Sequence, residues 1–372
     1  MRVESSENTV NNGSLAKALR RTARFHLADW LGPRIKPFKL RVKLTNRCNA
    51  RCIMCNVWRM QDNAAPSLPH EIPLEGYKRL CEVNRDFFSR LRRISLTGGE
   101  PTLRRDLVEI AQVLSEAYPQ ADLSINSNGF STRRVLEAVQ RILEFRKSLI
   151  LMMSLDGIGE AHDATRGVRN VFPKVQATID GLLELKRAGA NLKVEVNHVM
   201  TGRNADELPR VFAFCRERGI YLNPIYVIQG ELYDNEEADL SYSADLREKL
   251  KGHIRELMSE DRSLQLREVM DMLEGRPRDF HCWAGRIIFV LEDDGQLYPN
   301  GGCPKSFLLG NVKDFDYDVR RLLGSEQARS VIRRARRCRS CRLSCETMTT
   351  LQYPEALAGY RRRRQASRAE RA

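Results

Sequence analysis

The sequence lacks any long apolar run, and this absence argues against a helical membrane protein. No stretch of the 372 residues approaches the roughly 18 apolar residues that span a bilayer. The N-terminal segment MRVESSENTVNNGSLAKAL also lacks the apolar core of a secretory signal peptide. Both absences predict a cytoplasmic protein without a transmembrane segment. The hydrophobic content of 42% is ample for one large packed domain and a smaller second one.

Disulfide bonds are not expected in a reducing compartment, so the ten cysteines need another explanation. Clustered cysteines in a cytosolic protein more often bind metal or carry out redox chemistry. Eight of the ten fall into two groups, one near each end of the chain. Cys81 and Cys215 stand alone within apolar helical patterns, and we interpret both as small buried core residues.

The formal net charge is +14 at pH 7, and much of the excess of Lys and Arg lies toward the ends of the chain. Basic runs can bind nucleic acid, anionic lipid or an acidic partner, although a tail such as 361–372 is more often simply solvated. Residues 15–31 have amphipathic spacing with a basic face, which fits either peripheral membrane contact or packing on the main domain. No aromatic-rich basic surface is evident, so nucleic acid is not an expected partner.

Short β-rich runs alternate with amphipathic stretches of helical period between residues 40 and 227. The predicted strands are 40–45, 93–98, 123–128, 149–156, 192–199 and 220–227, and the predicted helices are 74–88, 105–118, 132–145, 171–188 and 205–218. Helical crossovers make neighbouring strands parallel. Six such units are too few to close an eight-stranded barrel, so we predict an α/β fold with a partial (β/α)6 TIM-like barrel that is open on one side.

The sequence pattern changes after residue 227. Residues 246–273 read as a long helix or helical linker, and RIIFVLEDDGQLYP predicts a β-hairpin with Asp294 and Gly295 at its turn. The expected organisation is a basic amphipathic extension (1–39), the partial barrel (40–227), a helical linker (228–281), a smaller domain of hairpin and helices (282–350) and a basic, disordered tail (351–372).

The first cysteine group lies in the loop after the first predicted strand, with the spacing Cys48-x3-Cys52-x2-Cys55. A structural zinc site usually takes four ligands, often in two pairs, whereas three thiolates without a nearby histidine suit a cubane iron–sulfur cluster with one iron left open. The polar motifs TGGEP, SNG and SLDG follow the next three predicted strands. In parallel α/β folds the carboxyl ends of strands are where the chemistry gathers.

These motifs, in this order, resemble the radical S-adenosylmethionine (SAM) superfamily over about residues 40–227. The resemblance implies that Cys48, Cys52 and Cys55 hold a 4Fe-4S cluster whose open iron is chelated by SAM. Reductive cleavage of SAM then releases a 5′-deoxyadenosyl radical that abstracts hydrogen from a substrate. The resemblance assigns to SAM binding the residues Met54, Thr97, Gly98, Gly99, Glu100, Pro101, Ser127, Asn128, Ser154, Asp156, Arg166 and Val199.

The resemblance also implies individual roles. Glu100 and the backbone of the GGE motif hold the SAM amino group, and the two glycines allow close backbone approach. Ser127 and Asn128 match the position that contacts the ribose and the methionine part, Arg166 resembles the arginine that pairs with the SAM carboxylate, and Val199 flanks adenine. The residue before the third cysteine is often aromatic in the family. Here it is Met54, whose thioether can still cover adenine.

Two of these assignments have an alternative that rests on the residues alone. Asp156 also fits a helix cap, and Arg166 also fits a surface charge. The sequence leaves both alternatives open.

The second cysteine group comprises Cys282, Cys303, Cys338, Cys341 and Cys345. The order C…AG…DG.LYP…C…LGNV…CxxC resembles the SPASM/twitch extension of radical SAM enzymes, which binds auxiliary iron–sulfur clusters. Since no cysteine follows Cys345, the shorter twitch form with one auxiliary 4Fe-4S cluster fits best. Cys282, Cys303, Cys338 and Cys341 are the preferred ligands, and Cys345 is an alternative fourth. A structural zinc site is the competing interpretation.

Four thiolates leave no open iron on an auxiliary cluster, which suits an electron conduit and an oxidative or redox-neutral outcome. Twitch enzymes of this build are similar to dehydrogenases that oxidise a secondary alcohol, and also to peptide-modifying enzymes, epimerases and a GTP cyclase. The ending QASRAERA lacks the double glycine of the cyclase, and only about 39 residues precede the first strand, too few for a peptide-recognition domain. We therefore expect a small-molecule substrate, with flavodoxin or ferredoxin as electron donor.

Candidates for a base near the open edge of the barrel are His198, Tyr226, Glu231 and Asp234, and the pattern favours none of them. The acidic loop 231–239 either meets a cationic amino sugar or is simply solvated. A basic, metal-stapled nucleic-acid-binding protein is the remaining alternative to an enzyme.

Overall fold

The computed structural model of the chain describes residues 36–60, 70–231, 233–260, 263–276, 278 and 282–338. The basic tail, nearly all of the predicted N-terminal extension, and Cys341 and Cys345 therefore lie outside the described residues. None of the helices in the described ranges combines the length and apolar character that a bilayer crossing requires.

One mixed sheet organises the described part of the chain. Its strands are β1 (Lys39–Lys43), β2 (Arg93–Thr97), β3 (Asp122–Ser127), β4 (Leu149–Ser154), β5 (Leu192–Met200), β6 (Tyr221–Tyr226), β7 (Ile288–Leu291), β8 (Gln296–Tyr298) and β9 (Gly310–Asn311). Their order is β6-β5-β4-β3-β2-β1-β7-β8-β9. Neighbours from β6 to β1 are parallel. The predicted partial barrel of six parallel strands is thus confirmed.

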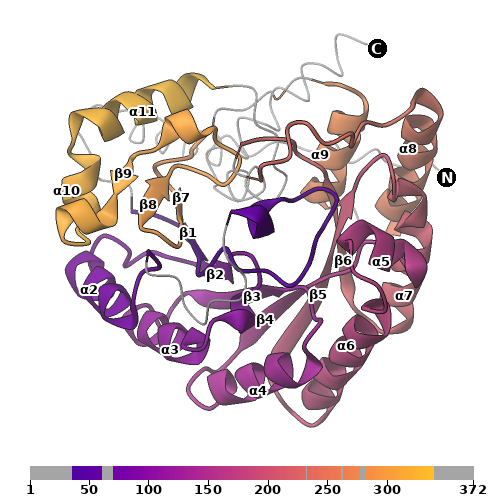
Figure 1. The fold of residues 1–372 in the computed structure, drawn as a ribbon, viewed down its shortest axis with the longest axis horizontal. Helices are drawn as coiled ribbons and strands as arrows, with labels where there is room; N and C mark the ends of the chain where they lie inside the picture. Colours follow the sequence, from indigo (N-terminus) through magenta and orange to yellow (C-terminus); the bar gives the residue numbers. More distant parts are fainter. Residues whose placement is uncertain are drawn as a thin grey trace, which may run out of the picture.

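Helices cover the outer side of the curved sheet, while the loop after β1 lies on its inner side (Figure 1). The outer helices are α2 (Leu74–Asn84), α3 (Leu107–Ala117), α4 (Thr132–Leu143), α5 (Glu160–Arg166), α6 (Phe172–Arg187) and α7 (Leu208–Glu217). Short 3-10 turns are η1 (Val57–Arg59), η2 (Pro101–Leu103), η3 (Ala205–Glu207), η4 (Lys305–Phe307) and η5 (Val312–Phe315). The sequence did not predict α5, because seven residues show too little periodicity to reveal a helix.

The region after β6 forms two helices rather than one. They are α8 (Ala244–Glu260) and α9 (Leu264–Leu273), both beside the β6 edge (Figure 1). Ser263 starts α9 as its N-cap, because its hydroxyl accepts a hydrogen bond from the Leu266 amide. The Gln265 side chain donates to the Pro224 carbonyl at 3.2 Å and so fastens α9 to β6. Of the two alternatives predicted over 246–273, a long helix or a helical linker, the structure contains no single long helix but two shorter ones.

The predicted hairpin is present, and it extends the barrel sheet. β7 pairs with β8 in antiparallel fashion, and β7 also pairs with β1 in parallel. After β9 the chain forms α10 (Val319–Leu323) and α11 (Glu326–Arg337). The buried Asn84 on α2 ties this part back to the barrel, since its side chain donates to the Tyr317 carbonyl and accepts from the Val319 amide. The hairpin and barrel thus share one sheet.

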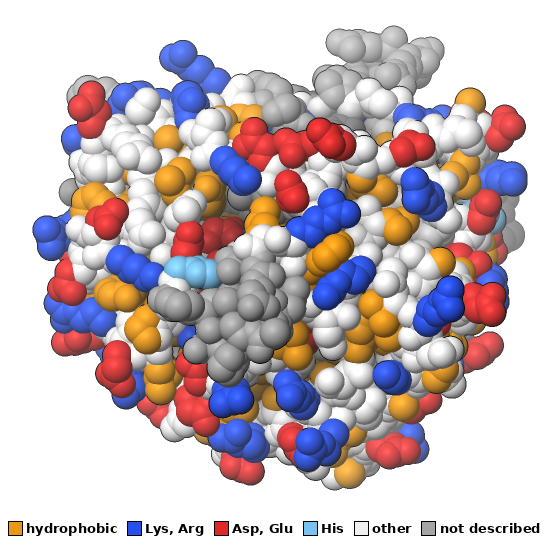
Figure 2. Space-filling model, in the orientation of Figure 1, with side chains coloured by type: hydrophobic (Ala, Val, Ile, Leu, Met, Phe, Trp, Pro, Cys, Tyr) orange, Lys and Arg blue, Asp and Glu red, His pale blue; other side chains and the backbone are white. Residues whose placement is uncertain are grey.

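Strand residues alternate between two environments, as the period of two requires. Outward residues such as Leu40, Val42, Leu96 and Val196 are buried under the helices. Inward residues are mostly polar, and they include Arg41, Ser95, Asn126, Ser154, Glu195, Asn197 and Asn223. The apolar face supplies the stabilising burial, so the inner face is left available for binding. On the molecular face shown in Figure 2, positive and negative side chains are interspersed rather than gathered into one basic patch.

Candidate functional site

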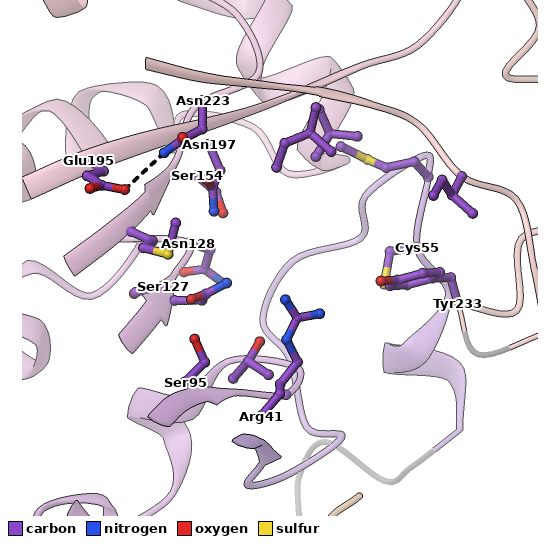
Figure 3. A pocket seen from close by; sticks show the side chains of 18 of the residues that line it. Arg41, Cys55, Ser95, Ser127, Asn128, Ser154, Glu195, Asn197, Asn223 and Tyr233 are labelled. Carbon is purple, nitrogen blue, oxygen red and sulfur yellow. Dashed lines mark hydrogen bonds between the residues drawn. The ribbon is translucent and has the colours of Figure 1, made fainter. Parts of the chain in front are cut away.

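The inner face of the sheet and the cysteine loop enclose a cavity of about 720 Å³ (Figure 3). This volume lies within the range of pockets that hold small ligands. Cys48, Cys52 and Cys55 all line the cavity. The carboxyl ends of the strands contribute Thr97, Ser127, Ser154 and Val199, and the loop adds Met54. The fold thus brings sequence-distant predicted residues to one place.

The GGEP segment after β2 supports the cysteine loop directly. The Gly99 amide donates to the Thr45 carbonyl at 2.6 Å, and the Glu100 amide donates to the Arg47 carbonyl at 2.8 Å. A Cβ atom on Gly98 would lie 2.3 Å from the Thr45 oxygen, and one on Gly99 would lie 2.1 Å from the Arg47 oxygen. Both glycines are therefore required for the close approach of two backbones within the protein, besides lining the cavity.

The outer part of the cysteine loop is held by two other segments. The Arg51 amide donates to the Arg166 carbonyl at 2.8 Å, and the Ile53 amide donates to the Thr165 carbonyl at 3.0 Å, both at the end of α5. The buried Asn235 side chain donates to the Met54 carbonyl at 2.7 Å. These backbone contacts fix the loop from both sides, which orients its side chains toward the cavity.

The turn of the C-terminal hairpin also reaches the cysteine loop. Asp293 is 1% exposed, and its two carboxylate oxygens accept hydrogen bonds from the Asn46 amide at 3.1 Å and from the Asn46 side chain at 3.0 Å. The neighbouring Glu292 pairs with Lys43 at 2.5 Å. Burial raises the pKa of Asp293, although the charges of Lys43 and His70 lower it. The hairpin therefore anchors the residues that lead into Cys48.

Glu100 is buried, and protein groups occupy both of its carboxylate oxygens. Thr102 and Ser127 donate to Oε1 through their hydroxyl groups at 2.7 and 3.0 Å, and the Asn128 amide donates to Oε2 at 2.7 Å. Burial raises the pKa of Glu100, and these hydrogen bonds act in the opposite direction. Neither Glu100 nor Pro101 lines the cavity. The carboxylate thus braces the loops after β2 and β3.

Asp156 and Arg166 form a buried ion pair of 2.6 Å at the end of β4. The other carboxylate oxygen of Asp156 accepts a hydrogen bond from the Val199 amide at 2.7 Å. Arg166 lines the cavity, and its Nη1 donates to the Cys52 Sγ at 3.4 Å. Burial lowers the pKa of Arg166, but Asp156 and the cysteines outweigh it, so the net shift is upward. Asp156 is therefore not a helix cap, and Arg166 is not a surface charge.

The cavity contains polar residues that the sequence did not single out. Glu195 accepts a hydrogen bond from the Asn223 side chain at 3.1 Å and pairs with Lys193 at 2.5 Å (Figure 3). Asn126 and Asn197 also line it, and their amide oxygens have no hydrogen-bond partner among the described residues. Alternation of polar and apolar residues along the predicted strands is the signal that could have identified them.

The structure separates the four candidate bases. Tyr226 lines the cavity and packs on Tyr242 with ring centroids 4.9 Å apart. His198 is fully buried in the core, where burial lowers its pKa. Glu231 accepts a hydrogen bond from the Lys305 amide at 2.7 Å, and neither it nor Asp234 lines the cavity. Among these four, only Tyr226 lines the cavity.

Two of the C-terminal cysteines lie near one another. Burial raises the pKa of Cys282, the nearby Cys338 raises it further, and Arg278 acts against both. Arg278 also donates to the Cys338 carbonyl. Cys303 is buried, and its amide donates to the Asn300 carbonyl at 3.2 Å. These contacts place Cys282 and Cys338 in one neighbourhood.

Comparison with known families identifies the barrel. The sequence profile described as the Radical SAM superfamily matches residues 42–215, which contain the cysteine loop and all the predicted motifs of the barrel. Residues 42–215 of the chain belong to the radical SAM superfamily. This family membership confirms the resemblance that the motifs indicated.

Individual relatives of this radical SAM protein share only part of their length with it. GTP 3′,8-cyclase of Nautilia profundicola is 31% identical over 194 residues, which cover 52% of this chain and 57% of the cyclase. The cyclase of Paracoccus denitrificans is 31% identical over 239 residues, or 60% and 63% of the two chains. The chain thus spans between half and two thirds of the curated relatives it matches. The solved structure of anSMEcpe with bound AdoMet and the Cp18Cys peptide has a TM-score of 0.59 at 18% identity, over 83% of this chain and 88% of that one.

The family implies SAM and a 4Fe-4S cluster, and the donor set of this chain fits both. Three thiols share the cavity, and burial followed by the charge of Cys52 raises the pKa of Cys48 to about 12 and of Cys55 to about 11. Ligation by iron requires the thiolate, and the charges of Lys43 and Arg166 act against the upward pKa shift of Cys55. No three His, Cys, Asp or Glu side chains within the described ranges stand close enough to hold a metal ion. Cluster binding therefore requires the thiols to turn toward one another.

Proposed function

We propose that this protein is a radical SAM enzyme whose Cys48, Cys52 and Cys55 hold a 4Fe-4S cluster. When bound, the cluster supplies the electron that cleaves SAM to a 5′-deoxyadenosyl radical, which abstracts hydrogen from a substrate. The observation that carries the proposal is that all three thiols line one cavity together with the polar ends of the strands.

The protein's own residues would hold SAM in two ways. We assign direct contact to cavity-lining residues, namely Met54, Thr97, Gly98, Gly99, Ser127, Asn128, Ser154, Arg166 and Val199. Glu100, Pro101 and Asp156 would act from behind the cavity wall, because both carboxylates are occupied by protein groups. Asn128, which donates to Asn49 at 2.7 Å, would link the ligand to the cysteine loop.

We further propose one auxiliary 4Fe-4S cluster on the C-terminal cysteines. Its preferred ligands are Cys282, Cys303, Cys338 and Cys341, with Cys345 as the alternative fourth. The proximity of Cys282 and Cys338 supports this assignment. The auxiliary cluster would carry away the electron left on the substrate, whereas a zinc ion at the same thiols would be structural only.

A dehydrogenation of a small molecule, such as oxidation of an alcohol, is the reaction we propose. A cavity volume of about 720 Å³ supports a small substrate over a folded protein. Tyr226 is the base candidate that the cavity supports. The names of similar proteins mention GTP for the cyclases and a peptide for anSMEcpe. Peptide modification is therefore the second candidate, and epimerisation is a further alternative. Flavodoxin or ferredoxin would supply the electron.

Iron and sulfide content after anaerobic reconstitution tests the proposal. We expect roughly eight irons per chain, falling to about four when Cys48, Cys52 and Cys55 are all replaced by Ala, with loss of 5′-deoxyadenosine formation. The matched control is the Cys282→Ala, Cys338→Ala variant, which should lose the other cluster and keep SAM cleavage. About four irons in the wild type, falling to zero in the triple variant, would contradict the proposed auxiliary cluster and its role as an electron conduit. Unchanged iron in the triple variant would contradict the whole proposal.

A further inference from the structure

The exposed face of α11 carries a stripe of arginines. Arg329, Arg333 and Arg337 recur every four residues, and side chains at this spacing lie along one side of a helix. The stripe extends over about 12 Å of the helix axis, and all three residues are exposed. The buried residues Ala328 and Val331 lie on the opposite side of the helix. The three guanidinium groups therefore point away from the protein.

The charge of this arginine stripe is not neutralised within the described part of the chain. There, none of the three arginines forms an ion pair. The single acid of α11 is Glu326, which stands in the first turn of the helix, about 16 Å along the axis from Arg337. Glu231, which reaches the segment beneath the helix, is engaged by the Lys305 amide. A local excess of positive charge of this kind attracts an acidic partner.

α11 is fastened to the segment that follows Cys303. Near the start of the helix, the Gln327 side chain donates a hydrogen bond to the Leu308 carbonyl at 3.0 Å. Two turns later, the guanidinium group of Arg334 donates to the Ser306 carbonyl. Both contacts come from side chains outside the arginine stripe. The helix is thus held along the chain that leads away from one of the C-terminal cysteines, while the stripe stays exposed.

The same helix meets the segments of the other two described C-terminal cysteines. A Cβ atom on Gly285 would lie 3.3 Å from the Ile332 side chain, so α11 packs on the turn that follows Cys282. Cys338 directly follows the last residue of the helix. An α-helix with its side chains is about 10–12 Å across. A protein bound to the arginine stripe would therefore lie about one helix diameter from these cysteines.

The residues of α11 limit the class of partner. The apolar side chains of the helix are buried or packed against the core, so its exposed face has none to insert into a membrane. The helix has no aromatic side chain on which the bases of a single-stranded nucleic acid could stack. Guanidinium groups bind carboxylates through paired hydrogen bonds, and a rigid helix presents them in a fixed pattern. These features favour an acidic protein surface.

We infer that the arginine stripe of α11 is the docking face for an acidic electron-carrier protein, which accepts electrons from the C-terminal cysteine site. This inference rests on the proposed function, because it names the partner of the proposed auxiliary cluster. In the oxidation of an alcohol, the substrate radical gives up one electron and its O–H proton as the C=O bond forms. The electron reduces the oxidised carrier by one equivalent, by way of the C-terminal cysteine site, and the proton goes to solvent.

Binding of oxidised flavodoxin, a small acidic carrier, to the reconstituted protein tests the inference by calorimetry. The triple variant Arg329→Glu, Arg333→Glu, Arg337→Glu should bind flavodoxin about tenfold or more weakly than the wild type, and its binding should depend less steeply on salt. Replacing the same three residues by Lys keeps the charges and should preserve most of the binding. Cytochrome c, a basic carrier, should not bind to the wild type.

A second charge reversal controls for the net charge of the protein. The variant Lys147→Glu, Lys186→Glu, Arg187→Glu changes the same number of exposed cations after α4 and at the end of α6, far from α11 (Figure 1). It should bind flavodoxin as the wild type does. Equal weakening in the two reversed variants overturns the inference, as does unchanged binding in the α11 variant. Tighter binding of a single-stranded oligonucleotide or of phosphatidylserine vesicles than of flavodoxin also overturns it.

The same protein samples separate this inference from the proposed function. Iron at the cysteine loop and formation of 5′-deoxyadenosine with dithionite as reductant do not require the carrier, so the α11 variant should keep both. Wild-type values for both, without charge-dependent binding of flavodoxin, would overturn the docking face and leave the radical SAM activity intact. Absence of iron from the cysteine loop would instead overturn the proposed function.

Discussion

The two cysteine-bearing regions of this protein differ in how the chain assembles them. The N-terminal region takes its three thiols from a single loop between positions 48 and 55, and hydrogen bonds from β2, α5, Asn235 and Asp293 hold that loop. The C-terminal cysteines are spread from position 282 to position 345. In the described part, Cys282 precedes β7 and Cys338 directly follows α11, and the two cysteines lie near one another.

This difference shows which parts of the structure hold the thiols of each site in place. A local loop keeps its ligands close in any folded or partly folded state, and its neighbours need only orient it. A dispersed set loses more chain entropy when it closes around one metal centre. We therefore expect the N-terminal site to depend on a few buried polar contacts, and the C-terminal site to depend on the whole hairpin region.

The largest expected effect comes from replacing one cysteine in each of the two regions. Cys52→Ala should reduce the release of 5′-deoxyadenosine to the level of protein without iron, because its thiol is one of the three proposed ligands in the loop. Cys282→Ala should keep most of this SAM cleavage, measured by chromatography after anaerobic reduction. Equal loss in both variants would show that the two regions form one functional unit.

The second prediction concerns the buried ion pair that supports the N-terminal site. Asp156→Asn leaves Arg166 buried without its carboxylate, which should lower the free energy of unfolding by about 3–5 kcal/mol. The matched control is Asp180→Asn, which breaks the more exposed 3.0 Å pair with Arg218 and should cost about 0–1 kcal/mol. Denaturant unfolding of the three proteins measures both changes. Similar losses in the two variants would mean that the Asp156 pair is not specially important.

The third prediction tests the contact between the regions. Asp293→Ala leaves both donors of Asn46 without their partner, which should destabilise the protein by about 1–3 kcal/mol and reduce iron bound at the cysteine loop. Asp294→Ala on the same turn removes only bonds to Gln296 and is the control. Iron content and thermal unfolding measure the outcome. A normal iron content in Asp293→Ala would show that the hairpin is not needed for iron binding at the cysteine loop.

The fourth prediction is a pH dependence that arises at α5. Burial and the charge of Arg166 lower the pKa of His162 from 6.5 to about 3, and its Nδ1 accepts a hydrogen bond from the Asp156 amide. Below pH 6.5 the unfolded chain gains a proton that the folded protein does not. Stability is therefore fully present above pH 6.5 and falls as the pH drops toward 3, by up to about 1.4 kcal/mol per pH unit.

His162→Gln isolates this contribution. Glutamine keeps a hydrogen-bond acceptor but does not titrate, so the variant should lose less stability than the wild type between pH 7 and pH 5. Urea unfolding at each pH measures the slopes. Parallel slopes would assign the pH dependence to other groups.

Much of the fold was predictable because its signals are local. The strands and the long helices follow from the period of apolar residues, and the hairpin turn follows from Asp294 and Gly295. The helix α5 was missed because it is short, and the sequence prediction did not place a break between the two helices α8 and α9 at Ser263. The pairing of β7 with β1 joins residues that are far apart in the chain, so no local pattern predicts it.

The sequence by itself determined the family, the order of strands and helices, and the cysteine loop, since each depends on residues that are neighbours in the chain. Tertiary structure alone decided that Glu100 and Asp156 are occupied within the protein, that Asp293 holds the cysteine loop, and that Arg41 faces Glu195 across one cavity. The physical reason is that burial, hydrogen-bond partners and the sign of local charge depend on residues brought together only when the sheet curves.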